Sequence, residues 1–493
     1  MKRIFAIIVS IMLFFCVSCD KNDDSNIKVI SSDFSVNENI KSNYLYQHSS
    51  VLNINGHCEP GATLVATLYN EKNSAVFSNS IVVDATGNYN IQVNTPSGSY
   101  GKYKLIINDY HKKFVKTYEN ILFGQVTLII GNTLIDETIE EVYKQNIDSL
   151  KDKLYIYDLT EEDSSWVTVS QESTIYNFMY HLYNVYCSDE YRNMPIGFVN
   201  VIYNQMLLEE LISNNNIFSS QSVLKYLTEH NKYKENPLNK GDSSYIIKNI
   251  LSKIHGLAVG DIIVSTDINE FKDIYLKSDY PKIYNIYARM LLGALKSVDE
   301  LIYRYNNLSI IQAGSYEYNN IYILRDIQSK ISNIVEDTYL IPTYDLNNLP
   351  TKSLNLAERY YNIVYDKKDV TEYANHFISD EDHTITIEFN NSYYFTNDFI
   401  NLFVYDKTGS IIKFNDGKIK AQNGFPSSII IDLSYEVEVI DEETGETIIE
   451  TRYYEVSKIC YGNIDNLNEH IIFNRHGIPV VPFTIIIDTL DEV

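Results

Sequence analysis

The sequence is short of positive charge. Its 40 lysine and arginine residues are outnumbered by 65 aspartate and glutamate residues, which gives a formal net charge of -25. A field of that sign repels phosphate backbones, so nucleic acid is excluded as a natural partner. With 45% hydrophobic and 21% charged residues the balance is otherwise that of a globular protein, and 493 residues exceed what one hydrophobic core holds.

Cysteine is also scarce, with five residues in all. Cys16 and Cys19 lie in the leader described next. The remaining Cys58, Cys187 and Cys460 are odd in number and fall in three different regions. Their spacing predicts neither a disulfide framework nor a zinc site, and we expect no cofactor.

Long apolar runs are missing after the first residues, where a secretory leader is indicated. Lys2 and Arg3 precede the apolar run Ile4–Phe15, whose roughly a dozen residues suit a signal peptide and are too few for a bilayer span. Cys16-Val17-Ser18-Cys19 then resembles a lipoprotein cleavage box, with Cys16 where leucine is usual. We predict a lipoprotein signal peptide over residues 1–18 and lipidation of Cys19. The alternatives are an ordinary cleaved signal and a single hydrophobic anchor.

Residues 19–26 form an acidic tether that includes Asp20-Lys21-Asn22-Asp23-Asp24-Ser25. This tail resembles the surface-export signal of lipoproteins in some Gram-negative lineages. It predicts an outer membrane lipoprotein exposed on the cell surface and held to the membrane by its lipid anchor only. An acidic tether is also simply a solvated linker.

Two regions carry short alternating runs that predict β-domains of the sandwich type. In residues 27–122, Ala62–Leu68 and Tyr89–Val93 alternate between turns rich in glycine and asparagine. In residues 367–493, Thr384–Phe389 alternates and Ser427–Leu433 reads as a buried strand.

Between them, residues 123–366 alternate apolar, β-branched runs with helical patterns. The pattern predicts an α/β domain, a parallel sheet with helices on both faces, whose functional groups lie at the carboxyl ends of the strands. The expected strands are Val126–Ile130, Ile196–Ile202, Ile262–Ser265 and Tyr339–Tyr344, and the expected helices Ile175–Tyr186, Tyr245–His255, Tyr284–Tyr305 and Ile321–Ile334.

A family resemblance begins at the first of these strands. Phe123-Gly124-Gln125-Val126-Thr127-Leu128-Ile129-Ile130-Gly131-Asn132-Thr133 is similar to F-G-E-V-W-L-C-S-G-Q-S-N-M in the sialate O-acetylesterase family. Further segments match in order: Trp166 ahead of a helix, Pro195–Asn200 with Glu209, Leu324–Gln328, Ile459–Asn466, Asn474–Pro479 and Pro482–Thr484. The resemblance implies an SGNH-hydrolase-like fold between β-domains and an activity that removes O-acetyl esters from sialic acids and related glycans.

The family's chemistry needs a serine nucleophile, a histidine base held by an aspartate, and oxyanion donors. The serine falls on Thr133, which is either a replacement nucleophile or, more plainly, a buried threonine at a strand end. The first oxyanion glycines fall on Asn204 and Gln205, whose side chains narrow the approach that glycine permits. The oxyanion asparagine falls on Glu270, whose carboxylate opposes a developing oxyanion; in a slipped register Asn269 takes that role.

The acid–base pair is replaced as well. The aspartate falls on Asn348 and the histidine on Pro350, and no histidine occurs between His255 and His376. Asp345 lies nearby but would have nothing to orient. Losing nucleophile and base together lowers turnover on the order of a million-fold, so we predict a degenerate member of the family without ordinary esterase activity.

Other candidate ligands are weak. Three histidines on helical patterns lack a paired spacing, and three acidic segments lack the alternation of a calcium loop. We interpret them as packed or surface histidines and solvated loops: His181, His230 and His255, then Glu161–Asp163, Asp380–Asp382 and Asp441–Glu443.

Three functions therefore stay open. The first is a surface lipoprotein whose degenerate esterase domain is retained for binding sialylated or O-acetylated glycans, or as an interaction module. The 42 tyrosines suit sugar stacking, although a codon bias that also favours asparagine, isoleucine and lysine explains them more simply. The others are a working carbohydrate O-acetylesterase with a rearranged site, and a structural or adhesive protein whose β-domains matter most.

Overall fold

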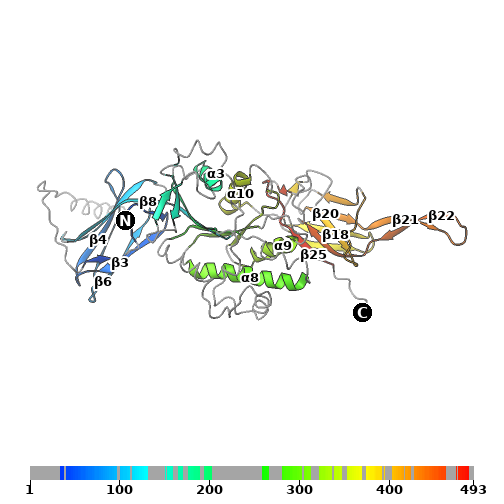
Figure 1. Cartoon of the computed structure of the whole chain (residues 1–493), viewed down its shortest axis with the longest axis horizontal. Helices are drawn as coiled ribbons and strands as arrows, with labels where there is room; N and C mark the ends of the chain where they lie inside the picture. The colour runs from blue at the N-terminus through cyan, green and yellow to red at the C-terminus, as the bar shows by residue number, and fades with distance from the viewer. Residues whose placement is uncertain are drawn as a thin grey trace, which may run out of the picture.

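The computed structural model shows an elongated molecule, with N-terminal strands at one end and a projecting hairpin of the C-terminal region at the other (Figure 1). Apart from gaps of a few residues, the structure describes residues 34–131, 150–158, 165–169, 176–188, 194–202, 258–265, 280–312, 321–346, 352–394, 402–461 and 473–487.

The N-terminal strands lie in two sheets. In the first, one face is buried and the other solvated: along β6, Tyr89, Ile91 and Val93 are buried and the residues between them exposed, the alternation expected of an antiparallel sheet. This sheet contains β1 (Ser35–Val36), β3 (Val51–His57) and β6 (Asn88–Asn94). The second contains β2 (Leu45–Gln47), β4 (Thr63–Tyr69), β5 (Ala75–Val82) and β7 (Lys102–Asp109).

The 17-residue strand β8 (Val115–Gly131) joins this second sheet to the middle of the molecule. Its first half pairs antiparallel with β7 and is largely exposed, whereas every residue from Phe123 to Gly131 is buried. The change has a physical cause, because the second half lies between two parallel neighbours and has both faces covered.

The middle of the molecule holds seven neighbouring strands in the order β10-β9-β11-β8-β12-β13-β14. Six of them are parallel, and β10 runs antiparallel to β9. The strands are β9 (Leu154–Asp158), β10 (Ser165–Thr168), β11 (Ile196–Ile202), β12 (Asp261–Ser265), β13 (Asn307–Ile311) and β14 (Thr338–Ile341). Four helices accompany them in the described ranges: α3 (Tyr176–Ser188) packs on α10 (Lys352–Val364), and α8 (Tyr280–Leu301) packs on α9 (Ile321–Ser332).

The prediction of an α/β class, with an SGNH-hydrolase-like parallel sheet and helices on both faces, is wrong. In the described residues strand far outweighs helix, and the parallel strands belong to a mixed sheet of 11 strands that continues into the N-terminal region. Strands β9, β10 and β13 have four or five residues, too few to show a period. The helical periodicity of a few longer segments therefore dominated the sequence pattern.

The C-terminal region consists of small antiparallel sheets around a separate core. Its buried members include Ile387, Ile429 and Ile459. The sheets are β15-β16-β20-β19, β18-β23-β25, β17-β24 and β21-β22. The strands are β15 (Tyr373–Ser379), β16 (Thr384–Phe389), β17 (Tyr393–Tyr394), β18 (Leu402–Asp406), β19 (Ile419–Gln422), β20 (Ser428–Asp432), β21 (Ser434–Ile440), β22 (Thr447–Tyr453), β23 (Val456–Tyr461), β24 (Phe473–Asn474) and β25 (Phe483–Ile486).

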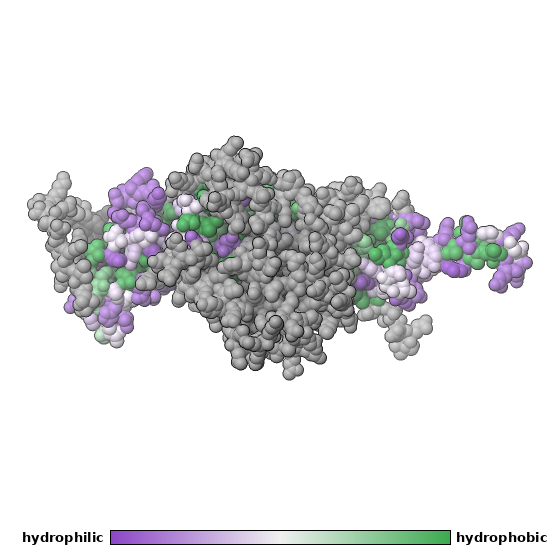
Figure 2. Space-filling view, viewed as in Figure 1, coloured by the Kyte–Doolittle hydropathy of each residue, from purple (hydrophilic) through white to green (hydrophobic). Residues whose placement is uncertain are grey.

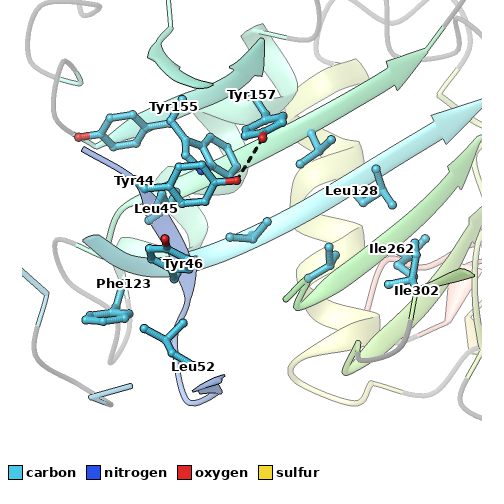
Figure 3. Packing of buried hydrophobic residues seen from close by; sticks show 14 of the residues in the cluster. Tyr44, Leu45, Tyr46, Leu52, Phe123, Leu128, Tyr155, Tyr157, Ile262 and Ile302 are labelled. Carbon is cyan, nitrogen blue, oxygen red and sulfur yellow. Dashed lines mark hydrogen bonds between the residues drawn. The ribbon is translucent and has the colours of Figure 1, made fainter. Parts of the chain in front are cut away.

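An aromatic core connects the N-terminal strands with the parallel strands (Figure 3). The Tyr44 hydroxyl donates a hydrogen bond of 3.2 Å to the Tyr157 hydroxyl, and the ring of Trp166 lies edge-on to both tyrosines. Trp166 also lies against Gly197, where a Cβ would approach its ring to 2.5 Å. Two segments quoted for the family resemblance, those of Trp166 and of Pro195–Asn200, are thus packed against each other.

Candidate functional site

The carboxyl ends of three central strands meet at one edge of the sheet. Gly131 of β8 is the register partner of Ile202 in β11 and of Ser265 in β12. In a sheet with parallel strands, ligands bind outside these ends. We call this edge, continued by the ends of β13 and β14, the candidate site.

The backbone conformation at position 131 requires a glycine. Its φ of +128° lies outside the range that side chains accept, and a Cβ would lie 1.8 Å from the carbonyl oxygen of Ser265. Gly131 is also the glycine of the segment that resembles G-Q-S-N. The family motif therefore keeps the residue that shapes the strand end.

The ends of β13 and β14 contribute buried polar groups. The Gln312 backbone N–H donates to Ile341 (2.9 Å), and the Thr343 hydroxyl donates to the Gln312 carbonyl oxygen (2.6 Å). The side chain of Gln312 is fully buried, and its Oε1 has no hydrogen-bond partner among the described atoms.

Beyond β14, Asp345 forms a two-pronged ion pair with Arg359 of α10. The Arg359 Nη1 and Nη2 atoms lie 2.7 Å from Oδ1 and 2.7 Å from Oδ2 of Asp345, and Nη1 also donates to the Pro342 carbonyl oxygen at 2.5 Å. Both side chains are buried. In this bidentate pair the guanidinium group binds both carboxylate oxygens of Asp345.

Sequence reasoning missed Arg359 as the partner of Asp345, although a signal exists. Arg359 lies three residues after Leu356 and four before Ile363, on the stripe of α10 that is buried. A charge on an apolar helical stripe requires a partner. Asp345, 14 residues earlier, is an acidic residue that could have been predicted as this partner.

Two C-terminal segments reach the same end of β14. The Tyr344 hydroxyl donates to the carbonyl oxygen of Val480 (2.7 Å) and lies 3.2 Å from the Tyr461 hydroxyl. The guanidinium of Arg325 is 5.2 Å from the centroid of the Tyr344 ring. Burial raises the pKa of Tyr344 well above its ordinary value, so this hydroxyl stays neutral and serves as a hydrogen-bonding group.

Helix α9 makes a second connection to the C-terminal region. Asp326 is buried, accepts a hydrogen bond from the Thr484 backbone N–H (3.2 Å), and pairs with Lys330 (2.8 Å). Asp326 and Thr484 belong to two more of the segments that resemble the esterase family. These two matching residues thus join α9 to the C-terminal region.

At the opposite edge of the sheet, Asp261 is a buried carboxylate that the sequence did not single out. It accepts hydrogen bonds from Tyr186 (3.2 Å), Tyr360 (2.9 Å), Asn307 (2.9 Å) and Tyr365. Burial raises its pKa, and the four hydrogen bonds oppose that shift. Since the donors come from α3, α10 and β13, Asp261 fastens these elements to the start of β12.

The residues predicted for the site lie outside the described residues: Thr133, Asn204, Glu270, Asn348 and Pro350, together with the lipidation residue Cys19. The structure describes the chain just before four of the site positions, at Gly131, Ile202, Ser265 and Leu346. The first three of these residues are brought together by the strand register. The loss of the catalytic groups stays a prediction from the sequence.

The candidate metal ligands give no site in the parts of the chain that are described. There, no group of three or more histidine, cysteine, aspartate or glutamate side chains could hold a metal ion. His181 is buried in α3, and burial lowers its pKa to about 4. His230, His255 and Glu161–Asp163 lie outside the described residues. Across the same described ranges, no helix has both the length and the apolar character of a membrane span.

The fold is similar to that of one solved carbohydrate acetylesterase. A carbohydrate acetylesterase from Xanthomonas citri matches it with a TM-score of 0.60, over 92% of this chain and 100% of that chain, at 13% sequence identity. At this identity the likeness shows the fold alone. Glycosidases also match: a putative β-galactosidase from Bacteroides fragilis (TM-score 0.23, 8% identity, 86% of this chain and 73% of that chain) and a β-glucuronidase from Ruminococcus gnavus (0.25, 9%, 68% and 59%). Their scores are too low to carry an argument. No protein-family model and no curated protein matches the chain.

Proposed function

We propose that this chain is a surface lipoprotein that binds glycans at the candidate site and lacks ordinary esterase activity. One observation carries the proposal: the Asp345–Arg359 ion pair. Asp345, the acidic residue nearest in sequence to Pro350, is buried, and both of its carboxylate oxygens bind the Arg359 guanidinium group. Because both of its oxygens bind Arg359, this carboxylate does not orient an imidazole base.

The residues at the nucleophile and base positions also support the absence of esterase activity. Pro350 stands where the family has its histidine, and the 120 residues between His255 and His376 contain no other histidine. Thr133 is the only hydroxyl at the nucleophile position, and a threonine without an adjacent base is a poor nucleophile. The nucleophile and the base are thus replaced, and the nearby carboxylate of Asp345 is bound to Arg359.

The scaffold around the site supports retention for binding. Gly131 shapes the strand end, Gly197 accommodates Trp166, and Asp326 holds Thr484. The contacts of Gly197 with Trp166 and of Asp326 with Thr484 join residues from segments that resemble the esterase family. A chain that keeps the frame of such a site and loses its reacting groups can still bind a ligand at the edge of the sheet.

The ligands we propose are sialylated or O-acetylated glycans. The acetylesterase fold and the resemblance to the sialate O-acetylesterase family both point to this class. The cell-surface location rests on the sequence, through the leader ahead of Cys19 and the acidic tether after it. A lipid anchor there would present the site to extracellular glycans.

Two measurements on the chain test this function. The first is acetate release from O-acetylated sialic acid and from 4-nitrophenyl acetate at high protein concentration. We expect no release above buffer, for the chain and for Thr133→Ala alike. The second is a glycan array with sialylated, de-acetylated and O-acetylated ligands, on which we expect selective binding.

Each measurement has an outcome that overturns the proposal. Acetate release that disappears in Thr133→Ala would show a working esterase with a rearranged site. A flat array across all sialylated and acetylated ligands would remove glycan binding and leave a structural or adhesive role.

A further inference from the structure

The hairpin of β21 and β22 projects from the C-terminal region into solvent (Figure 1). We call residues Ser434–Tyr453 the arm. Within the described residues, β21 pairs only with β22, and β22 only with β21. Every residue of β22 is exposed, and apolar side chains lie open along the arm, among them Ile440 (68% exposed) and Ile449 (66%). Figure 2 shows a hydrophobic patch on the projecting arm with hydrophilic surface on both sides of it.

The arm is held rigidly at its base. The ring of Tyr435 stacks on Tyr454 with centroids 4.3 Å apart, and Tyr453 stacks on His383 at 3.5 Å. At the tip, Asp441 Oδ1 accepts three hydrogen bonds from Glu443 and Thr444. A free two-stranded hairpin is marginally stable in water. Aromatic stacking thus holds the base of the arm against the C-terminal region, and hydrogen bonds within the turn close its tip.

The register divides the side chains of β21 between two faces. Val437 and Val439 lie on one face, with Ile448 of β22 opposite Val439. Glu436 and Glu438 lie on the other face, together with Ile440 and with Ile449 of β22, which is opposite Glu438. Since neighbouring strands place their side chains beside one another on each face, a strand added to the free edge of β21 would lie beside valines on one face and glutamates on the other.

We propose that the free edge of β21 is a docking site for an extended protein segment in which apolar and basic residues alternate. Such a segment places its apolar residues beside Val437 and Val439 and pairs its lysines or arginines with Glu436 and Glu438, while its backbone completes the open edge. Charge complementarity fits this partner, because the arm contains seven acidic residues and a single basic one, Arg452. The edge of β22 is not equivalent, since Thr447 to Tyr453 carry no such alternation.

A second copy of the chain does not fit the edge. Pairing β21 with β21 of another molecule would bring Glu436 and Glu438 beside the same carboxylates, and like charges on adjacent strands destabilise a sheet. The acidic residues therefore prevent self-pairing and favour a basic partner.

The test uses the chain and two dye-labelled synthetic peptides of identical composition. In one, valine and lysine alternate; in the other, the valines and the lysines form two blocks. Fluorescence anisotropy at about 0.15 M salt, where long-range attraction is largely screened, should show binding of the alternating peptide at least about tenfold tighter than of the block peptide. Equal affinities would overturn the proposal, since only general charge attraction would remain.

Substitutions locate the binding. Val437→Thr/Val439→Thr keeps the charge and the β-branched shape, and should weaken the alternating peptide about tenfold or more. Asp380→Asn/Glu381→Gln removes two exposed charges elsewhere and should leave its affinity unchanged. Unchanged binding by the valine variant, or an equal loss in the control, overturns the proposal.

A charge swap decides the question if the valine variant unfolds the arm, which amide hydrogen exchange of β21 and β22 would reveal. Glu436→Lys/Glu438→Lys should release the valine–lysine peptide and bind a valine–glutamate peptide instead. Failure to switch counts against the proposal. So does a dimer of the chain alone, seen in sedimentation and lost in the valine variant, because it would make a second copy the partner.

Discussion

Arg359 and Asp345 are joined by two parallel hydrogen bonds of 2.7 Å inside the molecule, at the carboxyl end of β14. The pair fixes α10 to the strand end where the sequence resemblance places an acid–base pair. The resemblance places the aspartate that orients the base on Asn348, three residues further along the chain. The Asp345 carboxylate instead stabilises the fold through Arg359.

Arg359→Met should lower the free energy of unfolding by about 3–5 kcal/mol, because it leaves the Asp345 carboxylate buried and unpaired. Guanidinium denaturation followed by circular dichroism measures the loss. The exposed pair of Arg452 and Glu450 is the control, and Arg452→Met should cost less than about 1 kcal/mol. In the double variant Asp345→Leu/Arg359→Met most of the loss should be restored; a double variant as unstable as the single one would contradict the buried-charge explanation.

Gly131→Ala should destabilise the chain by roughly 3 kcal/mol or more, since its Cβ would overlap the Ser265 carbonyl and part β8 from β12. Gly409→Ala is the matched control. Gly409 also has a positive φ, +83°, but nothing lies within 4 Å of the added carbon, so we expect a loss of about 1 kcal/mol. Equal losses in the two variants would refute the close approach at the strand end.

Trp166 is the chain's single tryptophan, so its fluorescence reports directly on the aromatic core. It is 9% exposed in the folded chain, and a Cβ at Gly197 would come within 2.5 Å of its ring. Gly197→Ala should shift the emission to longer wavelength and cost about 1–3 kcal/mol. Gly417→Ala, with no atom within 4 Å of the new carbon, should leave the spectrum as it is. An unshifted Gly197→Ala spectrum would place Trp166 elsewhere.

His181 should make stability fall in mildly acidic solution. Burial lowers its pKa from 6.5 to about 4, so between these values the unfolded chain binds a proton that the folded chain does not. The folded state therefore loses stability as pH drops through this window, by up to about 3 kcal/mol at its lower end. Unfolding free energies at several pH values should show a shallower slope for His181→Gln than for the natural chain. Parallel slopes would exclude His181 as the cause.

Cys19→Ala should abolish lipid attachment, because the acylated thiol is the anchor that the leader predicts. Metabolic labelling with a fatty-acid analogue, followed by membrane fractionation, checks this. Cys16→Ala keeps Cys19 and should remain labelled. Label retained in Cys19→Ala would mean that the leader acts as an ordinary signal or as a hydrophobic anchor.

Much of the local structure could be predicted from the sequence. Ile196–Ile202 and Thr384–Phe389 are strands with the expected bounds, because a run of β-branched residues or a strict alternation suits only an extended chain. The proportion of strand to helix could not be predicted. Strand β13 is only five residues long, and the apolar stripe of α10 is interrupted by Arg359. The family motifs still located the strand end at Gly131, through a glycine whose φ admits no other residue.

The sequence by itself determined the alternation of the strands, which depends on neighbouring residues, and it predicted a leader before Cys19 and a proline, Pro350, where the resemblance places a histidine. Only the tertiary structure decided which distant groups meet. Asp261 is bound by a tyrosine 99 residues away, and Asp345 is claimed by Arg359 rather than left free. The physical reason is that a buried charge must find its partner in space, and many acidic and basic residues along the chain could have served.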